Sequence, residues 1–564
     1  MNKRFGLMSV GLTVSVFTLT HAADRQWLPT EGGSYEWQNT ANWQGGILPG
    51  AGDQAQLRIT GQIGDQYIHL ASPVTVYSFF PGALDHSLFN QIFSGASISP
   101  TTNFRVMGGR VILENNVLLD GGMHHVGLVN GASLTLRNAG CLLSTNCAEV
   151  RIGSRNTSTT YFGGAGALYV EEGGRIQMRG SPSNWTGGLF IGLNDSTTDA
   201  GNPGKVWQSG GLIDLESLWI VGTSADGYYR LDGGTLRLPT AYPGGHRVGN
   251  GKVTYGLLHV SGGVLELPIK NAVWSDFSVG FGAVTGTQPA YSDFYLSGGT
   301  VSIPDRPIVL ANWSTQVSDT VPHQATMTVD GTAVVTGRNV GLGNSLSPAV
   351  SAALNLNGGL LSLNYYLSRF GGVNNQAVLN FNGGTLQWRG LNLSGSPIAN
   401  FTNIVVYGKG GTLDTTGLSI MTETPFRIAR GFGVGEIVLT NPGSGYGAAP
   451  RVAITGGSGS NATAVAVMTK TGTVERVVVT CPGEGYAETD VLSVAFIVPS
   501  TGVGHGGGAA ASVALAANTP GTFTKVGYGT WRVSQPNTFE GSVRFRAFLF
   551  ELGSRVVYQG NTSG

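Results

Sequence analysis

The chain has few charged residues and few cysteines, and both shortages narrow its function. Asp, Glu, Lys and Arg make up 11% of the 564 residues, with 32 basic and 32 acidic side chains. A nucleic-acid-binding protein needs an excess of Lys and Arg to displace counterions from phosphates, so we expect no nucleic-acid partner. Three cysteines in so long a chain are too few for a disulfide framework. The low charge also leaves few residues that could act as a general acid or base.

Long apolar runs are missing from most of the chain, and the one near the N-terminus predicts export. A basic segment, Asn2–Arg4, precedes an apolar stretch from Phe5 to Leu19, and residues 20–23 offer small side chains for cleavage. These features are typical of a secretory signal peptide, which we expect to cover residues 1–23. Later segments fall short of the about 18 consecutive apolar residues that a transmembrane helix needs, so no transmembrane span is predicted.

Glycine is abundant, and it recurs in pairs through the middle of the chain. The sequence contains 89 glycines, and each pair precedes a short segment in which apolar and polar residues alternate. The pairs begin at Gly173, Gly210, Gly233, Gly262, Gly298, Gly358 and Gly383, and Asp330-Gly331 stands in the one wide gap. A second motif, an apolar residue followed by glycine, keeps step with the pairs, as in Ile152-Gly153 and Val221-Gly222. Repeats of about 20–35 residues indicate stacked structural units.

The repeat predicts an all-β fold, a right-handed parallel β-helix (β-solenoid). Period-2 alternation places apolar side chains on one face of each strand, and only stacked units can bury such faces in a continuous column. Glycines at the corners supply positive φ where the chain turns sharply, and the handedness follows the rule for parallel crossovers. The alternative is a β-propeller, whose blades need about 40 or more residues and antiparallel hairpins. We expect the inward side chains to include Leu236, Leu265, Ile303, Leu361 and Leu386.

Composition and motifs divide the chain into five segments. The signal peptide (1–23) is followed by an N-terminal aromatic cap module (24–60), β-helix coils (61–430), C-terminal β-rich paired repeats (431–520) and a shorter last repeat (521–564). Trp37 and Trp43 in the cap can cover the open end of the core, and stacking against sugar rings is their alternative role. The paired repeats carry the motifs Pro442-Gly-Ser-Gly-Tyr446 and Pro482-Gly-Glu-Gly-Tyr486.

The C-terminal motifs are similar to those of a known family. They are Gly410-Gly411-Thr-Leu413-Asp414, the two Pro-Gly-x-Gly-Tyr motifs, Lys525-x-Gly527-x-Gly529-Thr-Trp531 and Asn537-Thr-x-x-Gly541. Together with Trp37, Trp43, Pro49 and Asp53-x-Ala55, they resemble autotransporter-associated β-strand repeat proteins of bacteria. The resemblance implies a β-helix of passenger type, secreted or displayed at the outer membrane, and generally without catalysis.

The chain departs from the family pattern in two places. Cys481 stands where the first paired repeat has Asn441. A membrane barrel or sorting anchor does not follow the last repeat, and we therefore expect the repeat at residues 521–564 to be incomplete.

β-Helices also carry polysaccharide lyases and glycosidases, which makes carbohydrate cleavage the alternative function. Glycoside hydrolysis needs two carboxylates on either side of the scissile bond. The candidates are Asp214, Glu216, Asp232 and Glu266, with Trp219 and Trp274 as aromatic residues that could line a groove. The same acidic residues also fit a hydrated outer face, which we prefer.

Other short motifs give no catalytic centre. The adjacent His124 and His125 point to opposite faces of any strand, so at most one of them can line a site. The segment Gly456–Asn461 is similar to a calcium-binding glycine repeat, but Asn461 replaces the ligand Asp. His505 lies alone in a glycine-rich run. We therefore predict no catalytic, cofactor-binding or metal-binding residue and no cofactor.

The remaining expectations concern thiols and partners. Cys141 and Cys147 are close enough in sequence to form a disulfide after export, while Cys481 is expected to be a lone thiol. We expect a structural or adhesive surface protein that presents loops to matrix, glycans or other cells. Extracellular polysaccharides or cell-surface components are its expected partners.

Overall fold

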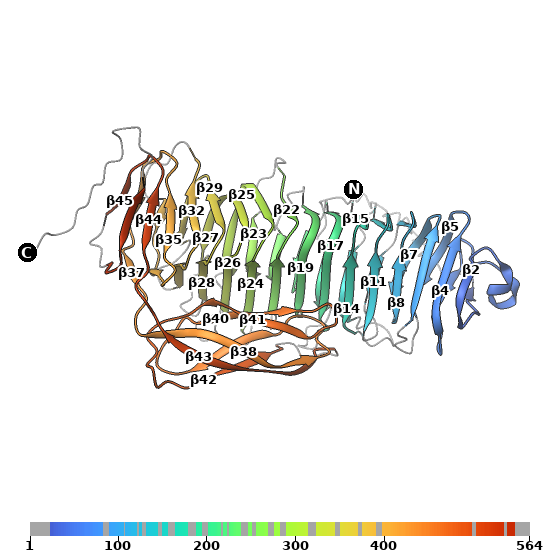
Figure 1. The fold of residues 1–564 in the computed structure, drawn as a ribbon. Helices are drawn as coiled ribbons and strands as arrows, with labels where there is room; N and C mark the ends of the chain where they lie inside the picture. The colour runs from blue at the N-terminus through green and yellow to red at the C-terminus, as the bar shows by residue number, and fades with distance from the viewer. Residues whose placement is uncertain are drawn as a thin grey trace, which may run out of the picture.

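The computed structural model contains a long rod with a smaller body along one side (Figure 1). It describes residues 23–546 except for 83–88, 107, 121–122, 127–130, 145–148, 156–163, 179–187, 195–200, 216–217, 223–224, 239–245, 251–254, 269–275, 283–288, 314–322, 344–349, 370–374, 391–396, 499–503 and 535–538. Almost all of the predicted signal peptide therefore lies outside the described residues, as do Cys147, Glu216 and Trp274 and the side chains of His124 and His125.

The rod is a parallel β-helix, as the sequence predicts. Forty of the described strands belong to one hydrogen-bonded system. The chain passes through three faces in a fixed order, which we name A, B and C, and then returns to face A one coil further on. For example, β18 (Leu218–Val221) and β20 (His246–Asn250) both lie on face A and pair in parallel, with β19 (Gly227–Arg237) crossing faces B and C between them.

The described strands of the rod fall into four groups, according to the face or faces on which they lie. Face A contains β1 (Asp24–Gln26), β3 (Gln54–Gln56), β10 (Met123–Val126), β13 (Glu149–Arg155), β16 (Gly188–Asn194), β18, β20, β23 (Phe277–Gly282), β30 (Leu367–Arg369), β33 (Ile398–Ala399), β36 (Ile420–Thr422) and β45 (Trp531–Val533). Face B contains β2 (Glu31–Glu36), β4 (Ile63–Leu70), β6 (Asn90–Gly95), β8 (Arg110–Leu113), β11 (Ala132–Leu136), β14 (Gly166–Val170), β21 (Tyr255–Val260), β24 (Ala290–Leu296), β26 (His323–Val329), β28 (Val350–Leu356), β31 (Gln376–Phe381), β34 (Asn403–Val406) and β37 (Phe426–Ile428). Face C contains β9 (Leu118–Asp120), β12 (Cys141–Ser144), β15 (Arg175–Met178), β22 (Val264–Glu266), β29 (Leu360–Leu363), β32 (Thr385–Trp388), β35 (Gly411–Asp414), β44 (Phe523–Val526) and β46 (Val543–Arg546). The bent strands β17 (Gly204–Leu215) and β19 run from B to C, and β5 (Val74–Phe80), β7 (Ile98–Val106), β25 (Thr300–Trp313) and β27 (Val334–Leu342) run from C to A.

The core is a column of apolar side chains that point inward from all three faces. On face C, Leu236, Leu265 and Val301 occupy matching register positions in successive coils. Burying an aliphatic side chain of this size stabilises the fold by about 1.5–3 kcal/mol. The predicted inward residues are all fully buried, which confirms the period-2 pattern: Leu236, Leu265, Ile303, Leu361 and Leu386.

The Gly-Gly pairs form the corners between face B and face C. Gly263 has a φ of +66°, in the left-handed region that favours glycine. Gly262 lacks such a φ, but a Cβ atom there would overlap the carbonyl oxygen of Asp232 in the preceding coil. In this pair the second glycine is thus required by backbone conformation, and the first by the close stacking of one corner on the next. At Gly173-Gly174 the order is reversed: Gly173 has a φ of +75°, and a Cβ atom at Gly174 would overlap the carbonyl oxygen of Leu136.

Aromatic side chains cluster near both ends of the described core. Near the N-terminus, the ring centroid of Trp43 lies 5.0 Å from that of Trp27 and 4.8 Å from that of Trp37. Two short 3-10 turns, η1 (Thr40–Asn42) and η2 (Gln44–Gly46), flank this cluster. Trp37 and Trp43 are each 1% exposed, so the hypothesis that they stack against sugars is wrong. Near the other end, the ring centroids of Phe426 and Phe523 lie 4.7 Å apart.

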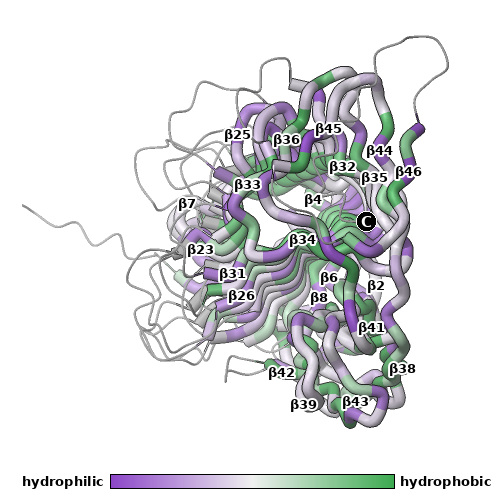
Figure 2. The backbone as a smooth tube through the Cα atoms, turned by 90° about the vertical axis from the view of Figure 1, so that its left-hand side faces the viewer, coloured by the Kyte–Doolittle hydropathy of each residue, from purple (hydrophilic) through white to green (hydrophobic). Residues whose placement is uncertain are grey.

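Residues 432–517 leave the rod between β37 and β44 and form what we call the inserted unit. Its strands are β38 (Phe432–Ser444), β39 (Arg451–Gly456), β40 (Thr463–Met468), β41 (Val474–Cys481), β42 (Leu492–Ile497) and β43 (Gly507–Ala517), in two antiparallel sheets. Beyond it, β44 pairs in parallel with β35, and β45 with β36, so the β-helix resumes where it stopped. The inserted unit therefore takes the place of one B-to-C corner, and it lies beside the stacked coils (Figure 2).

The two Pro-Gly-x-Gly-Tyr motifs adopt the same backbone conformation at opposite ends of the inserted unit. Gly443 and Gly445 of the first motif have φ values of +63° and +73°. The corresponding Gly483 and Gly485 have φ values of +72° and +77°. Both glycine positions of the motif therefore need positive φ, which explains why the sequence repeats them.

We predict that the stacked corners, more than positive φ alone, limit substitution in the β-helix. Gly262→Ala should lower the free energy of unfolding by about 2–3 kcal/mol, because its Cβ meets backbone that cannot move aside. Gly45→Ala, which has a φ of +73° but open space around the Cβ, should cost only about 1 kcal/mol. Gly507→Ala has neither constraint and should stay within about 0.5 kcal/mol of the parent. Urea denaturation followed by circular dichroism checks the order, and equal costs at Gly262 and Gly507 would contradict it.

Candidate functional site

The inserted unit folds back along face B toward the N-terminus (Figure 1). Outward-facing side chains of face B and apolar side chains of the inserted unit form a hydrophobic cluster separate from the core of the rod. Face B contributes Trp207, Tyr228, Tyr255, Leu257 and Tyr295, and the inserted unit contributes Val434, Val452, Val465 and Met468. Side chains that would face water in a bare β-helix are therefore interior here.

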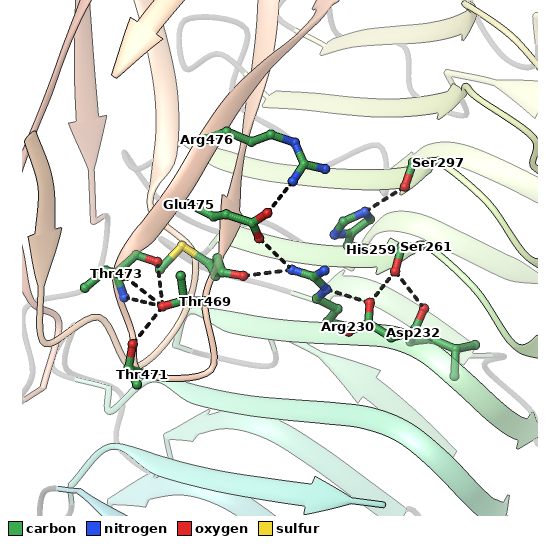
Figure 3. Close-up of polar contacts among 12 residues, drawn as sticks. Arg230, Asp232, His259, Ser261, Ser297, Thr469, Thr471, Thr473, Glu475 and Arg476 are labelled. Atoms are coloured by element: carbon green, nitrogen blue, oxygen red, sulfur yellow. Dashed lines mark hydrogen bonds and ion pairs between the residues drawn. The ribbon is translucent and has the colours of Figure 1, made fainter. Parts of the chain in front are cut away.

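Arg230 on β19 joins the two units (Figure 3). Its Nε donates to Asp232 Oδ1 at 2.6 Å, and its Nη1 donates to the carbonyl oxygen of Met468 at 2.8 Å and to Glu475 Oε2 at 3.3 Å. The guanidinium also lies over the Trp207 ring, 4.3 Å from the centroid. The charge of Arg230 is thus balanced by one carboxylate from each unit.

Nearby on face B, His259 is held in its neutral form. Its ring stacks on Tyr295 with a centroid distance of 4.9 Å, and its Nε2 lies 3.0 Å from Ser297 Oγ. Burial, and then the positive charges of Arg230 and Arg476, lower the pKa of His259 to about 3. Protonation of this ring would therefore oppose the docking of the inserted unit.

The pKa of Asp293 on β24 is shifted upward, opposite to that of His259. Burial raises the pKa of Asp293 to about 6, against the hydrogen bonds from Tyr255 and Thr326 and the charge of Arg451, which all favour the carboxylate. Tyr255 Oη donates to Asp293 Oδ2 at 2.8 Å, and the Arg451 guanidinium of the inserted unit lies 3.8 Å from the centroid of Tyr291. The carboxyl group of Asp293 therefore gains or loses a proton at the interface near pH 6.

At the N-terminal end of this interface, the two units enclose a cleft of about 660 Å³. Its floor is the outward surface of face B around β8, β11, β14 and β17. Its wall comes from two loops of the inserted unit, residues 445–447 and 470–471. The first loop includes Tyr446 of the first Pro-Gly-x-Gly-Tyr motif. Both units are thus needed to form the cleft.

The register of the floor explains why it is hollow. Arg110, Ser133, Ala167 and Lys205 occupy matching positions on four neighbouring strands. Since neighbouring strands lie about 4.8 Å apart, the backbones that carry the two basic residues are about 14 Å apart. The small side chains of Ser133 and Ala167 leave the space between them open, and Tyr169 stands in the adjacent row.

Lys205 and Tyr169 hold the wall of the cleft against its floor. Lys205 Nζ donates to the carbonyl oxygen of Lys470 at 2.8 Å, and Tyr169 Oη donates to the same oxygen at 3.2 Å. Lys470 Nζ in turn lies 3.4 Å from Glu171 Oε1. Burial lowers the pKa of Lys205 to about 8, so its ammonium group is mostly protonated at pH 7. An ammonium group has three donors, which leaves donors of Lys205 for a ligand.

Basic side chains outnumber acidic ones in this cleft, although the whole chain contains 32 of each. Arg137 forms an ion pair with Glu114, which is not among the lining residues, at 2.7 Å. Even with this pair and the contact to Glu171 counted, the cleft stays positive and favours an anionic group. Among the described lining residues, the basic ones are Arg110, Arg137, Lys205 and Lys470, and the acidic one is Glu171.

The carboxylates proposed from the sequence lie elsewhere and do not face each other as a pair. Asp214 and Glu266 are two strands apart on face C, about 9–10 Å, and Arg237 occupies the register position between them. Arg237 Nε lies 3.2 Å from Glu266 Oε1. Asp232 is bound to Arg230. A cation therefore stands where a substrate would have to lie between Asp214 and Glu266.

The hypothesis that Trp219 lines a groove beside these acids is wrong. Its side chain is fully buried in the core of the rod, with its ring centroid 5.5 Å from that of Tyr229. Trp219 is the second residue of the four-residue strand β18 and points inward, and alternation in so short a segment did not reveal this. Trp274 and Glu216 lie outside the described residues, so their roles stay predictions.

Cys481 is a free, buried thiol at the interface, as predicted. Its Sγ donates to Tyr407 Oη at 3.3 Å, and Asn380 Nδ2 lies 3.5 Å from the same sulfur. Burial raises the pKa of the Cys481 thiol to about 11. Asn441, at the corresponding place in the first motif, is exposed and accepts a hydrogen bond from the Gly443 amide. The two repeats differ here because only the second one meets face B at this position.

His505 and the loop at residues 456–461 make contacts within the protein. His505 of the inserted unit lies with its Nε2 3.1 Å from the carbonyl oxygen of Gly201 and its Nδ1 3.7 Å from Asp226 Oδ2. In the loop that was compared with a calcium repeat, the amide of Ser458 donates to Asp490 Oδ2 at 2.8 Å. Cys141 has a free thiol, so its predicted disulfide with Cys147 is wrong for this structure; Cys147 itself lies outside the described residues.

The basic residues of the cleft were missed by sequence reasoning. Arg110, Lys205 and Lys470 come from three segments that are far apart in the sequence, and each resembles any other basic residue on an exposed strand or loop. Within the described part of the chain, no cluster of three or more His, Cys, Asp or Glu residues could hold a metal ion. The described residues also include no helix long and apolar enough to cross a membrane. Comparisons with protein-family models, curated proteins and solved structures found no match.

We predict that Asp293 makes the stability of the docked protein depend on pH. Because its folded pKa, about 6, is above the value of an unfolded Asp, 3.8, its contribution is present at acid pH and is lost as the pH rises through about 6. The substitution Asp293→Asn removes this pH-dependent contribution to the free energy of unfolding. The stability of the variant relative to the parent should therefore increase by about 2–3 kcal/mol between pH 4 and pH 7.

Urea denaturation of both proteins at several pH values measures this difference. The comparison with the parent is needed because two other groups also make stability depend on pH. Burial lowers the pKa values of His259 and His323, so the folded protein loses stability as the pH falls and these rings become protonated. Parallel pH curves for the variant and the parent would show that Asp293 does not titrate at the interface.

Proposed function

We propose that this protein is an exported structural or adhesive protein of the bacterial cell surface, in which the β-helix is a stiff rod that presents ligand-binding surfaces. The observation that carries the proposal is the single parallel ladder that links described strands from β1 to β46. Every coil is hydrogen-bonded to its neighbours, so the rod can hold a binding surface at a distance from its attachment. The signal peptide expected at residues 1–23 agrees with this location.

The links between strands support a role in display. Apart from the inserted unit, the described B-to-C corners are short, and many of them contain glycine. Links beside face A are often longer: β13 ends at Arg155 and β14 begins at Gly166, and β15 ends at Met178 and β16 begins at Gly188. Because coils stack in register, the strand ends from which equivalent links start lie along one line, as Arg155 and Asn194 do. Binding groups repeated in this way would let a polymer make several weak contacts at once, which raises its overall affinity.

The charges on the rod favour binding over cleavage. Arg237 separates Asp214 from Glu266, and Glu171, the one acidic residue that lines the cleft, lies within 3.4 Å of Lys470 Nζ. A pair of carboxylates with space for a sugar between them is what a glycosidase requires. The cleft instead offers cations and neutral hydrogen-bonding groups, which suit the holding of a ligand.

We predict that the chain is processed on export. When the full sequence is expressed in a bacterium with a secretion pathway, the exported protein should begin at Ala23 or Asp24, because residues 20–23 provide the cleavage site. N-terminal sequencing of intact exported protein, extracted from the cell surface with urea and without protease, measures this. Exported protein that still begins at Met1 would contradict the predicted signal peptide.

We predict that the mature protein binds polysaccharides without cleaving them. Beads coated with the full mature chain should adhere to a panel of immobilised extracellular polysaccharides, while the soluble protein releases no new reducing ends or unsaturated products from them. Beads coated with an unrelated secreted protein are the control. Turnover that disappears in Asp214→Asn would support the alternative, a carbohydrate-active β-helix, and failure to adhere to any surface would overturn adhesion.

A further inference from the structure

The cleft combines groups from two units that are separate in the sequence, and we propose that it binds an acidic polysaccharide, one that carries carboxylate or sulfate groups. This inference rests on the proposed function and names the ligand class of one site. The rod supplies Arg110, Tyr169 and Lys205, and the inserted unit supplies Lys470 and the loop around Tyr446.

The positions of the basic residues favour an extended anionic ligand over a single small ion. Arg110 and Lys205 stand at the two ends of a row of four strands, about 14 Å apart at the backbone. One small anion could contact both only if the two side chains extended fully toward each other. A chain with acidic groups at intervals can lie over Ser133 and Ala167 and reach both cations.

The remaining lining suits sugar rings. Ser133 and Thr135 provide hydroxyl groups that can both donate and accept, as sugar hydroxyl groups require, and Asn90, whose Nδ2 is bound to Asp65, provides a carbonyl oxygen that accepts. Tyr169 offers a partly buried aromatic ring on the floor, with Lys470 Nζ 5.9 Å from its centroid. A binding groove for single-stranded nucleic acid would need several aromatic platforms for successive bases, and Tyr169 and Tyr446 are the aromatic side chains among the described lining residues.

The protonation of Lys205 should couple binding to pH. The groups that face it are Tyr169 on β14, Lys470 in the inserted unit and, further along the floor, Arg110, with Glu171 and Arg137 at the edge of the cleft. Burial keeps the pKa of Lys205 at about 8, so its charge is lost between pH 7 and pH 9 while the arginines stay charged. An anionic ligand should therefore bind more weakly above pH 8.

The test uses the full mature chain and four immobilised polymers: polygalacturonate, dextran sulfate, neutral dextran and single-stranded DNA. The parent should bind at least one of the two acidic polysaccharides more tightly than dextran and DNA. Arg110→Gln and Lys205→Met should each weaken that binding about tenfold, the cost of one charge-assisted hydrogen bond. The matched controls Arg532→Gln and Lys409→Met change exposed basic residues elsewhere on the rod and should bind like the parent.

A third variant separates charge from packing. Lys205→Arg should retain binding at pH 7 and, unlike the parent, should not lose it between pH 7 and pH 9. Circular dichroism and the thermal midpoint of each variant show whether it is folded. Equal binding by the parent, Arg110→Gln and Lys205→Met would overturn the cleft as the site, and so would equal affinity for dextran or preference for DNA. If the beads still adhere in that case, the proposed surface function stands and only the cleft is excluded.

Discussion

The close stacking of glycine corners is the constraint on which the rest of the rod depends. At Gly262 a Cβ atom would overlap the carbonyl oxygen of Asp232 one coil below, so the corner exists only without a side chain. Tight corners keep the three faces in register, and the register in turn places Leu236 and Leu265 over each other in the core. A single coil could bury little of its apolar surface, which is why the fold is cooperative along its length. The aromatic clusters near both ends of the described coils complete this arrangement, because their large rings fill the core there.

The inserted unit uses the same corner for a different purpose. It replaces the turn between β37 and β44, and its two sheets cover the outward side of face B. Its interface joins an apolar cluster to buried charges whose compensation is local: Arg230 is matched by Asp232 and Glu475, and Arg427 of β37 forms an ion pair with Glu484 at the other end of the unit. Such compensation matters, because an unpaired buried charge would cost several kcal/mol, on the order of 3–5. The cleft exists only where this cover stops short.

The candidate site illustrates the limit of reasoning from residue types. Acidic residues on strands of neighbouring coils were reasonable partners, yet the register inserts Arg237 between Asp214 and Glu266. Trp219 was expected to lie at the surface of a groove, yet its side chain points into the core of the rod. Arg110 and Lys205 carried no motif at all, and they share a site because three strand pairings place them in one row and a loop from residue 470 lies over them.

The sequence by itself determined the β-helix, since a period-2 apolar pattern interrupted by glycine pairs can be buried only by stacking, and it determined which leucines point inward. It also marked the change of character after residue 430, through the two Pro-Gly-x-Gly-Tyr motifs. Only the tertiary structure decided that the chain returns to the ladder at β44, that the inserted unit lies back on face B, and that a positive cleft results. The physical reason is that alternation and corner conformation are local properties, whereas the docking of β38–β43 depends on contacts between residues up to about 300 positions apart, such as Tyr169 and Lys470.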